Sequence, residues 1–478
     1  MTEHNRRTIL RLLATGTGVS LGGVGSALAS QSAGGHDELR LFSEVGVAGA
    51  NEVVDDGNYV YVATGGGMSV VDWRNPGRPE VVAEVDLVSD LQANLGIENP
   101  VVDILDLKVD DGVAALANNG SENPGGISLY DVSDPTNPQF LAQYEPTFDG
   151  PGPSPGADIH NCYLEDGYAY LTLAEPWSVD DDGDGERERY WLFGNTGVEI
   201  VDIRDPANPQ QAARWLLKDD EPEVAKASRV PCHDVYVQDG VCYAALWDAG
   251  TAALDVSDPT NPTLVSRFGS DVDASDAIPA FEIGVDDFNT YLFEQFDFAA
   301  YLTAPGNAHY VQPSTDGNYV FVGAETFPKD VGISNPGVDD YGGIEVWDTS
   351  DLSNPQFVTR IDPPVIDDDQ SGKLFTSHNF DVTANRLHTS WYHGGVHVYD
   401  ITDPTTPEHL AGYDPDGYAF WTAVSGRGFT VGGVYGAASA NAGGVTILNN
   451  DRGVKQPPAF DGSNPSGQPD VVPDANRE

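Results

Sequence analysis

Cysteine and basic side chains are both scarce in this chain of 478 residues. There are only three Cys, and three thiols cannot all pair, so the sequence implies no disulfide framework. Lys and Arg together number 23 against 75 acidic residues, which gives a formal net charge of −52. A charge this negative argues against nucleic acid or an anionic membrane surface as a partner.

The acidity has two possible explanations. Disorder is one, but the chain is 40% hydrophobic and contains 20 Tyr and 8 Trp, which favours a folded core. The other is a densely carboxylated surface suited to concentrated salt, where repulsion is screened within about 3 Å at 1 M. Only six of the basic residues are Lys. This composition resembles that of proteins from salt-loving archaea, and we interpret the acidity as an adaptation to salt.

Long apolar runs are missing after the first 30 residues, so the sequence predicts no membrane-spanning helix. The first residues contain the pair Arg6-Arg7, an apolar run with Gly, and Ala27-Leu28-Ala29. This pattern resembles a twin-arginine export signal, which carries proteins that are already folded. We therefore expect residues 1–29 to be a signal peptide and the mature protein to be secreted or held at the cell surface.

One strand-ending phrase recurs along the chain. It occurs as LYDVSDPTNP (129–138), IVDIRDPANP (200–209), ALDVSDPTNP (253–262) and VYDITDPTTP (398–407). A hairpin with a turn signal such as Asp239-Gly240 precedes each phrase, and a short strand follows it. The repeated unit is thus four short antiparallel strands, about 50 residues long, which is typical of a β-propeller blade.

The last repeat predicts how the ring closes. Six copies are complete, but a seventh, which starts near Phe420, lacks its fourth strand. Leu39 to Val45 match the fourth-strand pattern and precede the first blade, so this N-terminal strand should complete the last blade. We predict an all-β, seven-bladed β-propeller of four-stranded blades over residues 37–452 and a disordered acidic tail over 453–478.

The phrases IVDIRDPANP, LYDVSDPTNP and VYDITDPTTP resemble the LVIVD-repeat family. The resemblance covers nearly the whole mature chain and implies a propeller fold and export. It implies little about activity. The first and last repeats depart from the pattern, as terminal repeats tend to.

Four of the ten His occupy one repeat position, the start of the innermost strand, in four consecutive blades: His160, His233, His309 and His378. Innermost strands surround the central channel, so these side chains should converge at one mouth. Ala50, Leu105 and Phe420 take about this position in the other blades. The histidines are thus confined to one side of the ring.

Two interpretations of the histidines stay open. Imidazoles from separate strands commonly hold a transition metal. The arrangement is similar to the iron centre of carotenoid-cleaving propeller oxygenases, and that likeness implies iron or copper. Alternatively, the repeated His-Asn and His-Asp pairs hydrogen-bond the neighbouring blade and have only a structural role.

Three long insertions fall on the same predicted face as the histidines: 175–196, 325–342 and the aromatic-rich link 269–306. Loops on one face of a scaffold often carry recognition, so these should cover the histidine mouth. His393, in a loop on that face, is a candidate additional ligand or general base, although a lone loop His is usually solvated.

A second candidate metal site lies within the first insertion. Asp180, Asp182, Asp184 and Gly185 follow the spacing of a calcium-binding loop. The position of the closing acid is Trp191, however, and a solvated acidic loop is the alternative.

The sequence has no G-x-S-x-G, Walker or Rossmann motif, so nucleophilic and nucleotide chemistry have no support. One functional hypothesis is an exported binding scaffold that uses the insertion-bearing face for a small molecule or a protein. The alternative is a metal-dependent oxidoreductase or oxygenase with iron or copper on the four histidines. Whether the protein is an enzyme stays open, and we expect a monomer.

Overall fold

The computed structural model describes residues 37–450, with gaps at 120–123, 149–157, 180–188, 228, 271, 283–306, 329–336, 365–373, 437–438 and 440–441. The predicted export signal and acidic tail lie outside the described residues.

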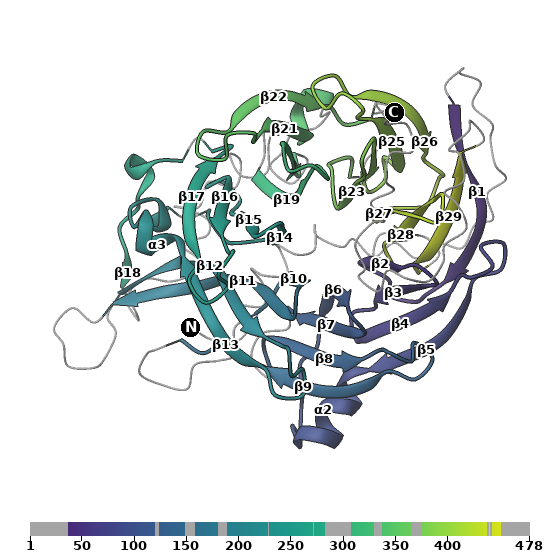
Figure 1. The fold of residues 1–478 in the computed structure, drawn as a ribbon, viewed down its shortest axis with the longest axis horizontal. Coiled ribbons are helices and arrows are strands. Elements are labelled where there is room, and N and C mark those ends of the chain that lie inside the picture. Colours follow the sequence, from purple (N-terminus) through teal and green to yellow (C-terminus); the bar gives the residue numbers. More distant parts are fainter. Residues whose placement is uncertain are drawn as a thin grey trace, which may run out of the picture.

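Seven four-stranded antiparallel blades surround a central axis in chain order (Figure 1). This confirms the predicted seven-bladed β-propeller. In each blade the first strand of the repeat lies nearest the axis and the last lies at the rim (Figure 1). None of the described helices is long and apolar enough to cross a membrane.

The strands of the first three blades are β2 (Val53–Asp56), β3 (Tyr59–Ala63), β4 (Gly67–Asp72) and β5 (Glu80–Asp86); β6 (Ile104–Asp110), β7 (Val113–Asn118), β8 (Ile127–Asp131) and β9 (Gln139–Tyr144); β10 (Cys162–Glu165), β11 (Tyr168–Val179), β12 (Arg189–Asp202) and β13 (Gln210–Leu216). Blades four to six are β14 (Asp234–Gln238), β15 (Val241–Ala245), β16 (Thr251–Asp255) and β17 (Thr263–Phe268); β19 (Asn307–Pro313), β20 (Tyr319–Glu325), β21 (Ile344–Asp348) and β22 (Gln356–Ile361); β23 (Phe380–Val382), β24 (Arg386–Ser390), β25 (Val396–Asp400) and β26 (Glu408–Tyr413). The last blade is β27 (Phe420–Gly426), β28 (Phe429–Val434), β29 (Gly444–Asn450) and β1 (Asp37–Gly46). The short elements outside the blades are β18 (Phe281–Glu282), α2 (Leu87–Leu95), α3 (Leu217–Asp220), and the 3-10 turns Val224–Lys226, Ala274–Asp276 and Val338–Asp340.

The fourth blade shows how the repeated phrase forms its turns. Asp239 and Gly240 have φ of 52° and 77°, so both central residues of the β14–β15 hairpin are left-handed, as a tight hairpin of this twist requires. After β16 the Asp255 carboxylate accepts a hydrogen bond from the Ser257 N–H, at 3.0 Å. Such Asp side chains cap the turn backbone and end the strand.

The N-terminal strand closes the ring, as predicted. β1 pairs antiparallel with β29, with Leu41 opposite Leu448. Its first two residues also pair in parallel with β26, so blades six and seven share one eight-stranded sheet.

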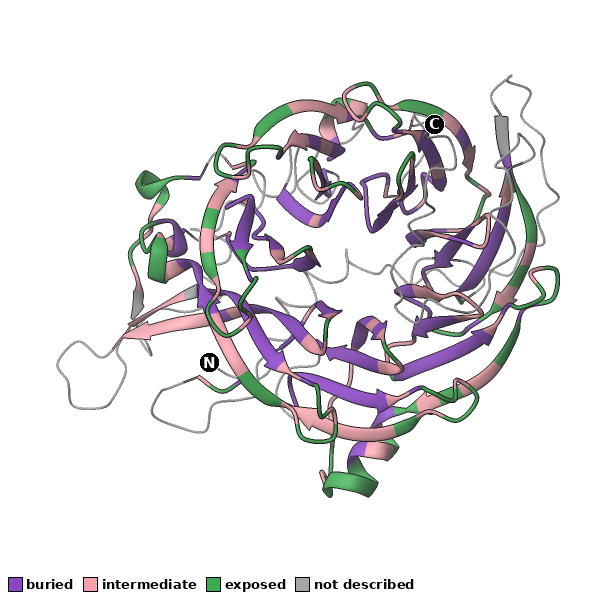
Figure 2. Cartoon of the chain, in the orientation of Figure 1, coloured by how far each residue is buried: buried purple, intermediate pink, exposed green. Residues whose placement is uncertain are grey.

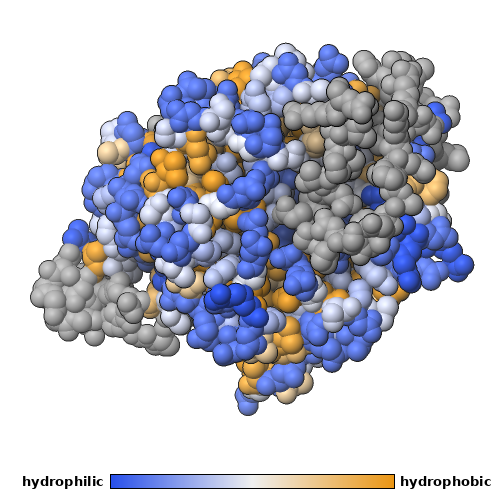
Figure 3. All heavy atoms as spheres, in the orientation of Figure 1, coloured by the Kyte–Doolittle hydropathy of each residue, from blue (hydrophilic) through white to orange (hydrophobic). Residues whose placement is uncertain are grey.

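Apolar contacts between neighbouring blades form the core. Buried residues concentrate on the inner strands, whereas the rim strands alternate between exposed and half-buried residues (Figure 2). One cluster, for example, joins Ala115 and Ile127 of blade two to Leu171 of blade three. Each blade therefore needs its neighbours to bury its faces, as in other repeat folds. On the face drawn in Figure 3, hydrophilic residues predominate around smaller apolar groups.

Much of the described part of the first insertion, 175–196, forms paired strands, whereas the sequence predicted a loop. β11 and β12 continue as a paired hairpin out to Val179 opposite Arg189, and β18 adds a fifth strand beside Arg189 and Tyr190. Paired strands therefore fill most of the segment 175–196. The described end of the link 269–306 lies against this hairpin, because Trp191 donates a hydrogen bond to the Ile278 carbonyl.

His388 in β24 provides a test of how burial affects stability. Burial lowers its pKa from 6.5 to about 4, and its Nδ1 lies 2.9 Å from Thr430 Oγ1. The unfolded chain binds this proton first, so stability should fall as pH decreases from about 6.5 to about 4. His388→Gln should remove up to about 3 kcal/mol of this acid-induced loss. Urea unfolding of both proteins between pH 4.5 and 8 tests this; parallel pH profiles would contradict it.

Candidate metal centre

The structure brings the four repeat-position histidines together on the axis side of blades three to six. His160, His233 and His378 stand just before the innermost strands β10, β14 and β23. The fourth, His309, lies inside β19. All except the half-buried His160 are buried.

Adjacent imidazole rings contact one another in an arc. Ring centroids are 4.0 Å apart for His160 and His233, and 4.0 Å apart for His233 and His309. The next step, from His309 to His378, is 4.6 Å. The side chains thus form one continuous cluster that four separate strands supply.

Backbone carbonyls orient two of the rings. His233 Nδ1 donates to the His309 carbonyl at 3.2 Å, and His378 Nδ1 donates to the Trp421 carbonyl at 2.6 Å. Since a carbonyl only accepts, Nδ1 carries the proton and Nε2 keeps its lone pair. Histidines that bind metal usually donate their other ring N–H to such an acceptor. Both carbonyls belong to the next blade, so the same hydrogen bonds also link neighbouring blades.

Glu325, the last residue of β20, joins the cluster. Its Oε2 lies 3.3 Å from His309 Nε2, and its Oε1 lies 4.0 Å from His378 Nε2. The Tyr392 hydroxyl donates to Oε1 at 2.7 Å. Sequence reasoning placed Glu325 at the start of a loop and missed it; the available signal was one acid at the end of the apolar strand YVFVGAE.

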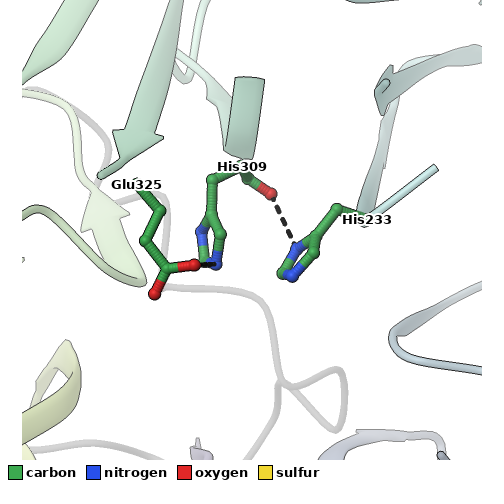
Figure 4. Close-up of side chains that lie close together, drawn as sticks. All are labelled: His233, His309 and Glu325. Carbon is green, nitrogen blue, oxygen red and sulfur yellow. Dashed lines mark hydrogen bonds and ion pairs between the residues drawn. The ribbon is translucent and has the colours of Figure 1, made fainter. Parts of the chain in front are cut away.

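Three side chains meet the geometric requirement for a shared ion. The ligand atoms of His233, His309 and Glu325 all lie within 4.8 Å of one another (Figure 4). It is the one such group among the described His, Cys, Asp and Glu side chains. The histidine arc therefore contains a two-His, one-carboxylate core, with His160 and His378 at its sides.

Burial sets the charge of this group. It lowers the pKa of His160 to about 4 and that of His378 to about 3. Burial lowers the pKa of His233 well below 6.5, and the neighbouring imidazoles lower it further. Burial also lowers the pKa of His309 well below 6.5, and His378 and His160 add to this effect. Burial also raises the pKa of Glu325 to about 8, against the opposing Tyr392 hydrogen bond. At neutral pH the imidazoles are neutral, the state in which they bind metals.

Two segments of the chain match a known family of sequence repeats. The family described as "LVIVD repeat" matches residues 49–86 and 232–269, which are the first and fourth blades. The chain is thus a seven-bladed β-propeller that contains LVIVD repeats. The first blade was predicted to depart from the repeat pattern, but it is one of the two that match. No curated protein sequence matches the chain.

Solved structures similar to this LVIVD-repeat propeller share little sequence with it. Raptor from Chaetomium thermophilum has a TM-score of 0.49 and 10% identity, over 87% of this chain and 30% of that one. Sqt1 from Saccharomyces cerevisiae has a TM-score of 0.46 and 8% identity, over 87% and 98% of the two chains. The computationally designed Ika8 protein has a TM-score of 0.44 and 11% identity, over 87% and 100%. The seven blades are defined by the strand pairing of this chain.

Two aromatic residues with unusual backbone geometry flank the histidines. Trp247 follows β15 in blade four and Tyr392 follows β24 in blade six, with φ of 46° and 47°. A left-handed backbone is costly for bulky residues and is tolerated where surrounding contacts enforce it. Trp247 stacks on His233 at 5.9 Å, and Tyr392 meets the edge of His378 at 4.8 Å. The strained residues thus hold the two rings in place.

The other blades place different residues at the histidine position. Ala308, just before His309, forms a backbone bridge with Trp247 of the preceding blade. Phe420 and Ile104 form the corresponding bridges in their blades, with Tyr392 and Gly65. Trp421 and Leu105 are therefore the equivalents of His309. The prediction of Phe420 was therefore one residue early.

In blade one the equivalent is Asn51, not Ala50. The Asn51 N–H bonds the Ala63 carbonyl as the His233 N–H bonds the Ala245 carbonyl.

His393, the predicted additional ligand or base, has another contact. Its Nδ1 accepts a hydrogen bond from the Leu374 N–H at 3.0 Å, and its own N–H donates to the Leu374 carbonyl at 3.0 Å. These bonds join two loops of blade six. The adjacent Tyr392, not His393, reaches Glu325.

Asp180, Asp182 and Asp184 fall outside the described residues, so the calcium loop stays a prediction. Cys162 is buried, with Sγ 4.0 Å from Asp106 Oδ2, and burial raises the pKa of its thiol well above 9.0. Such a thiol is unreactive.

Proposed function

We propose that this LVIVD-repeat propeller binds one transition-metal ion through His233, His309 and Glu325, with His160 and His378 as adjacent donors. The convergence of three buried ligand atoms within 4.8 Å carries this proposal. Two imidazoles with one carboxylate form a ligand set that leaves coordination positions open, and non-haem iron(II) commonly occupies it. The chemistry that fits best is therefore that of a metal-dependent oxidoreductase or oxygenase.

Two features of the chain support a metal over a purely structural role. Glu325 is a carboxylate buried to 4% exposure, and a buried acid is costly without a charged partner. A bound cation supplies that partner and displaces its proton. His309 Nδ1 is buried without a hydrogen-bond partner among the described residues, so no hydrogen bond in the described part of the chain satisfies this nitrogen.

Metal reconstitution tests the proposal. Protein stripped with a chelator in high salt is incubated in turn with Fe(II), Cu(II), Mn(II) and Zn(II), desalted and analysed for bound metal. We expect about one ion per chain for the preferred metal. His388→Gln removes a buried imidazole away from the site and serves as the matched control, which should bind equally. A wild-type chain that retains no metal would overturn the proposal.

Tyr392 should tune the site without binding the ion. Tyr392→Phe removes the hydrogen bond that fixes Glu325, and loss of such outer partners typically lowers metal affinity about 10- to 100-fold. Competition against a fluorescent chelator measures the change. Tyr435→Phe, in the same aromatic cluster, is the control and should leave affinity unchanged. Equal affinities for Tyr392→Phe and wild type would show that Tyr392 does not orient the carboxylate.

A binding-scaffold role is the second candidate. A β-propeller is a general interaction scaffold, and here the β11–β12 hairpin extends beyond the other blades (Figure 1). We propose this hairpin as the surface for a protein or small-molecule partner. Shortening it between Glu175 and Thr196 should abolish capture of that partner and leave metal binding intact. Unchanged capture would show that the hairpin is not the binding surface.

A further inference from the structure

A second group of polar side chains follows the histidines by one residue along the inner strands. Glu52, Asp106 and Asp234 come from blades one, two and four and are 5%, 4% and 2% exposed. Each accepts a hydrogen bond from another blade: Glu52 from Asn379, Asp106 from the Cys162 N–H and Asp234 from Asn161. Strands from separated blades can bring carboxylates together only around the axis, so these form a common buried layer.

The layer contains more negative than positive groups. Lys108 is buried beside Asp106 and forms a salt bridge with it. Asn379 donates to Glu52 Oε2 at 2.6 Å, and Asn161 donates to Asp234 Oδ2 at 2.5 Å. Three carboxylates thus share one ammonium group and neutral amides, and buried charge in such excess is costly without a further cation.

Asn161 supplies an independent sign of a ligand. The residue is 3% exposed, and its Oδ1 is buried without a hydrogen-bond partner among the described residues. Its other amide atom contacts Asp234, so the oxygen without a partner lies at the carboxylate layer. An unsatisfied buried acceptor costs about 1–3 kcal/mol. Amide and carboxylate oxygens are the ligands that hard cations prefer.

We propose that an alkali-metal cation binds in this layer, bridging the Asp234 carboxylate and Asn161 Oδ1 beside the hydrogen bond that joins these two side chains. The three carboxylates do not gather within 4.8 Å as the histidine core does, which disfavours a small divalent ion. A large monovalent ion accepts more widely spaced oxygen ligands and keeps part of its hydration shell. The proposal does not depend on a metal at the histidines.

Ion-specific thermal stability tests the site. Chelator-treated protein is unfolded in equal concentrations of NaCl, KCl and tetramethylammonium chloride at constant pH. The preferred alkali ion should raise the wild-type Tm by about 3 °C or more over tetramethylammonium, because only the folded state binds it. Asp234→Asn should lose this increment. Glu98→Gln removes one exposed carboxylate and should keep it.

Crystals soaked in rubidium chloride provide a direct readout on the wild-type protein, which decides the question even where Asp234→Asn does not fold. We expect one anomalous peak between Asp234 and Asn161. No peak in this layer, or an alkali increment that persists in Asp234→Asn, would overturn the proposal. In that case protons rather than a cation neutralise the layer.

Discussion

Removing residues 37–46 should destabilise the whole propeller by about 5 kcal/mol or more, which is comparable with the total stability of many domains. The deletion removes the rim strand β1 and leaves β29 as an unpaired edge. It also removes the β1–β26 pairing that joins the sheets of blades six and seven. We expect a large fall in Tm and association of the open rings through the free edge, seen by size-exclusion chromatography.

Two matched substitutions in β1 distinguish the loss of side-chain packing from the loss of the strand itself. Leu39 and Leu41 lie on the same strand, but Leu39 is 3% exposed and Leu41 is 40% exposed. Leu39→Ala should cost about 2–5 kcal/mol, whereas Leu41→Ala should cost about 0.5 kcal/mol or less. Equal costs would show that β1 does not pack against the last blade as described.

Removing His309 should abolish metal binding at micromolar concentration. His309 lies between His233 and Glu325, and loss of a direct ligand should exceed the roughly 10- to 100-fold cost of losing an outer partner. His233→Ala and Glu325→Gln should have similar effects. Isothermal titration with the preferred metal gives the affinities.

The ranking of variants distinguishes two forms of the site. With a two-His, one-carboxylate core, His160→Ala and His378→Ala should lose less than about 10-fold in affinity. A chelator should lower the Tm of the wild type but not that of His309→Ala. If His160→Ala were as damaging as His309→Ala, the four histidines would share the ion equally, as the repeat pattern alone suggested.

The sequence predicted the fold because the repeat carries its own turn chemistry. Asp239-Gly240 and the Asp-Pro phrases mark hairpins and strand ends locally, and the missing fourth strand of the last repeat required β1. The site was only half predictable. A shared repeat position identified the histidines, but Glu325 ends a strand and Tyr392 lies in the loop after β24, and neither belongs to the repeated phrase that marks the turns. Their approach depends on blade twist and on two left-handed residues, which no local pattern encodes.

Pairing between Leu41 and Leu448 also fixes the order of folding. Synthesis delivers β1 first and its partner strand almost last, so the ring stays an open arc until nearly the whole chain has emerged. Closing the ring requires β1 to pair with β29, and most of the described sequence lies between these two strands. Contacts between residues so far apart in sequence form slowly. We therefore expect unfolding to start with the separation of β1 from β29. Hydrogen exchange should be faster in these two strands than in blades three and four.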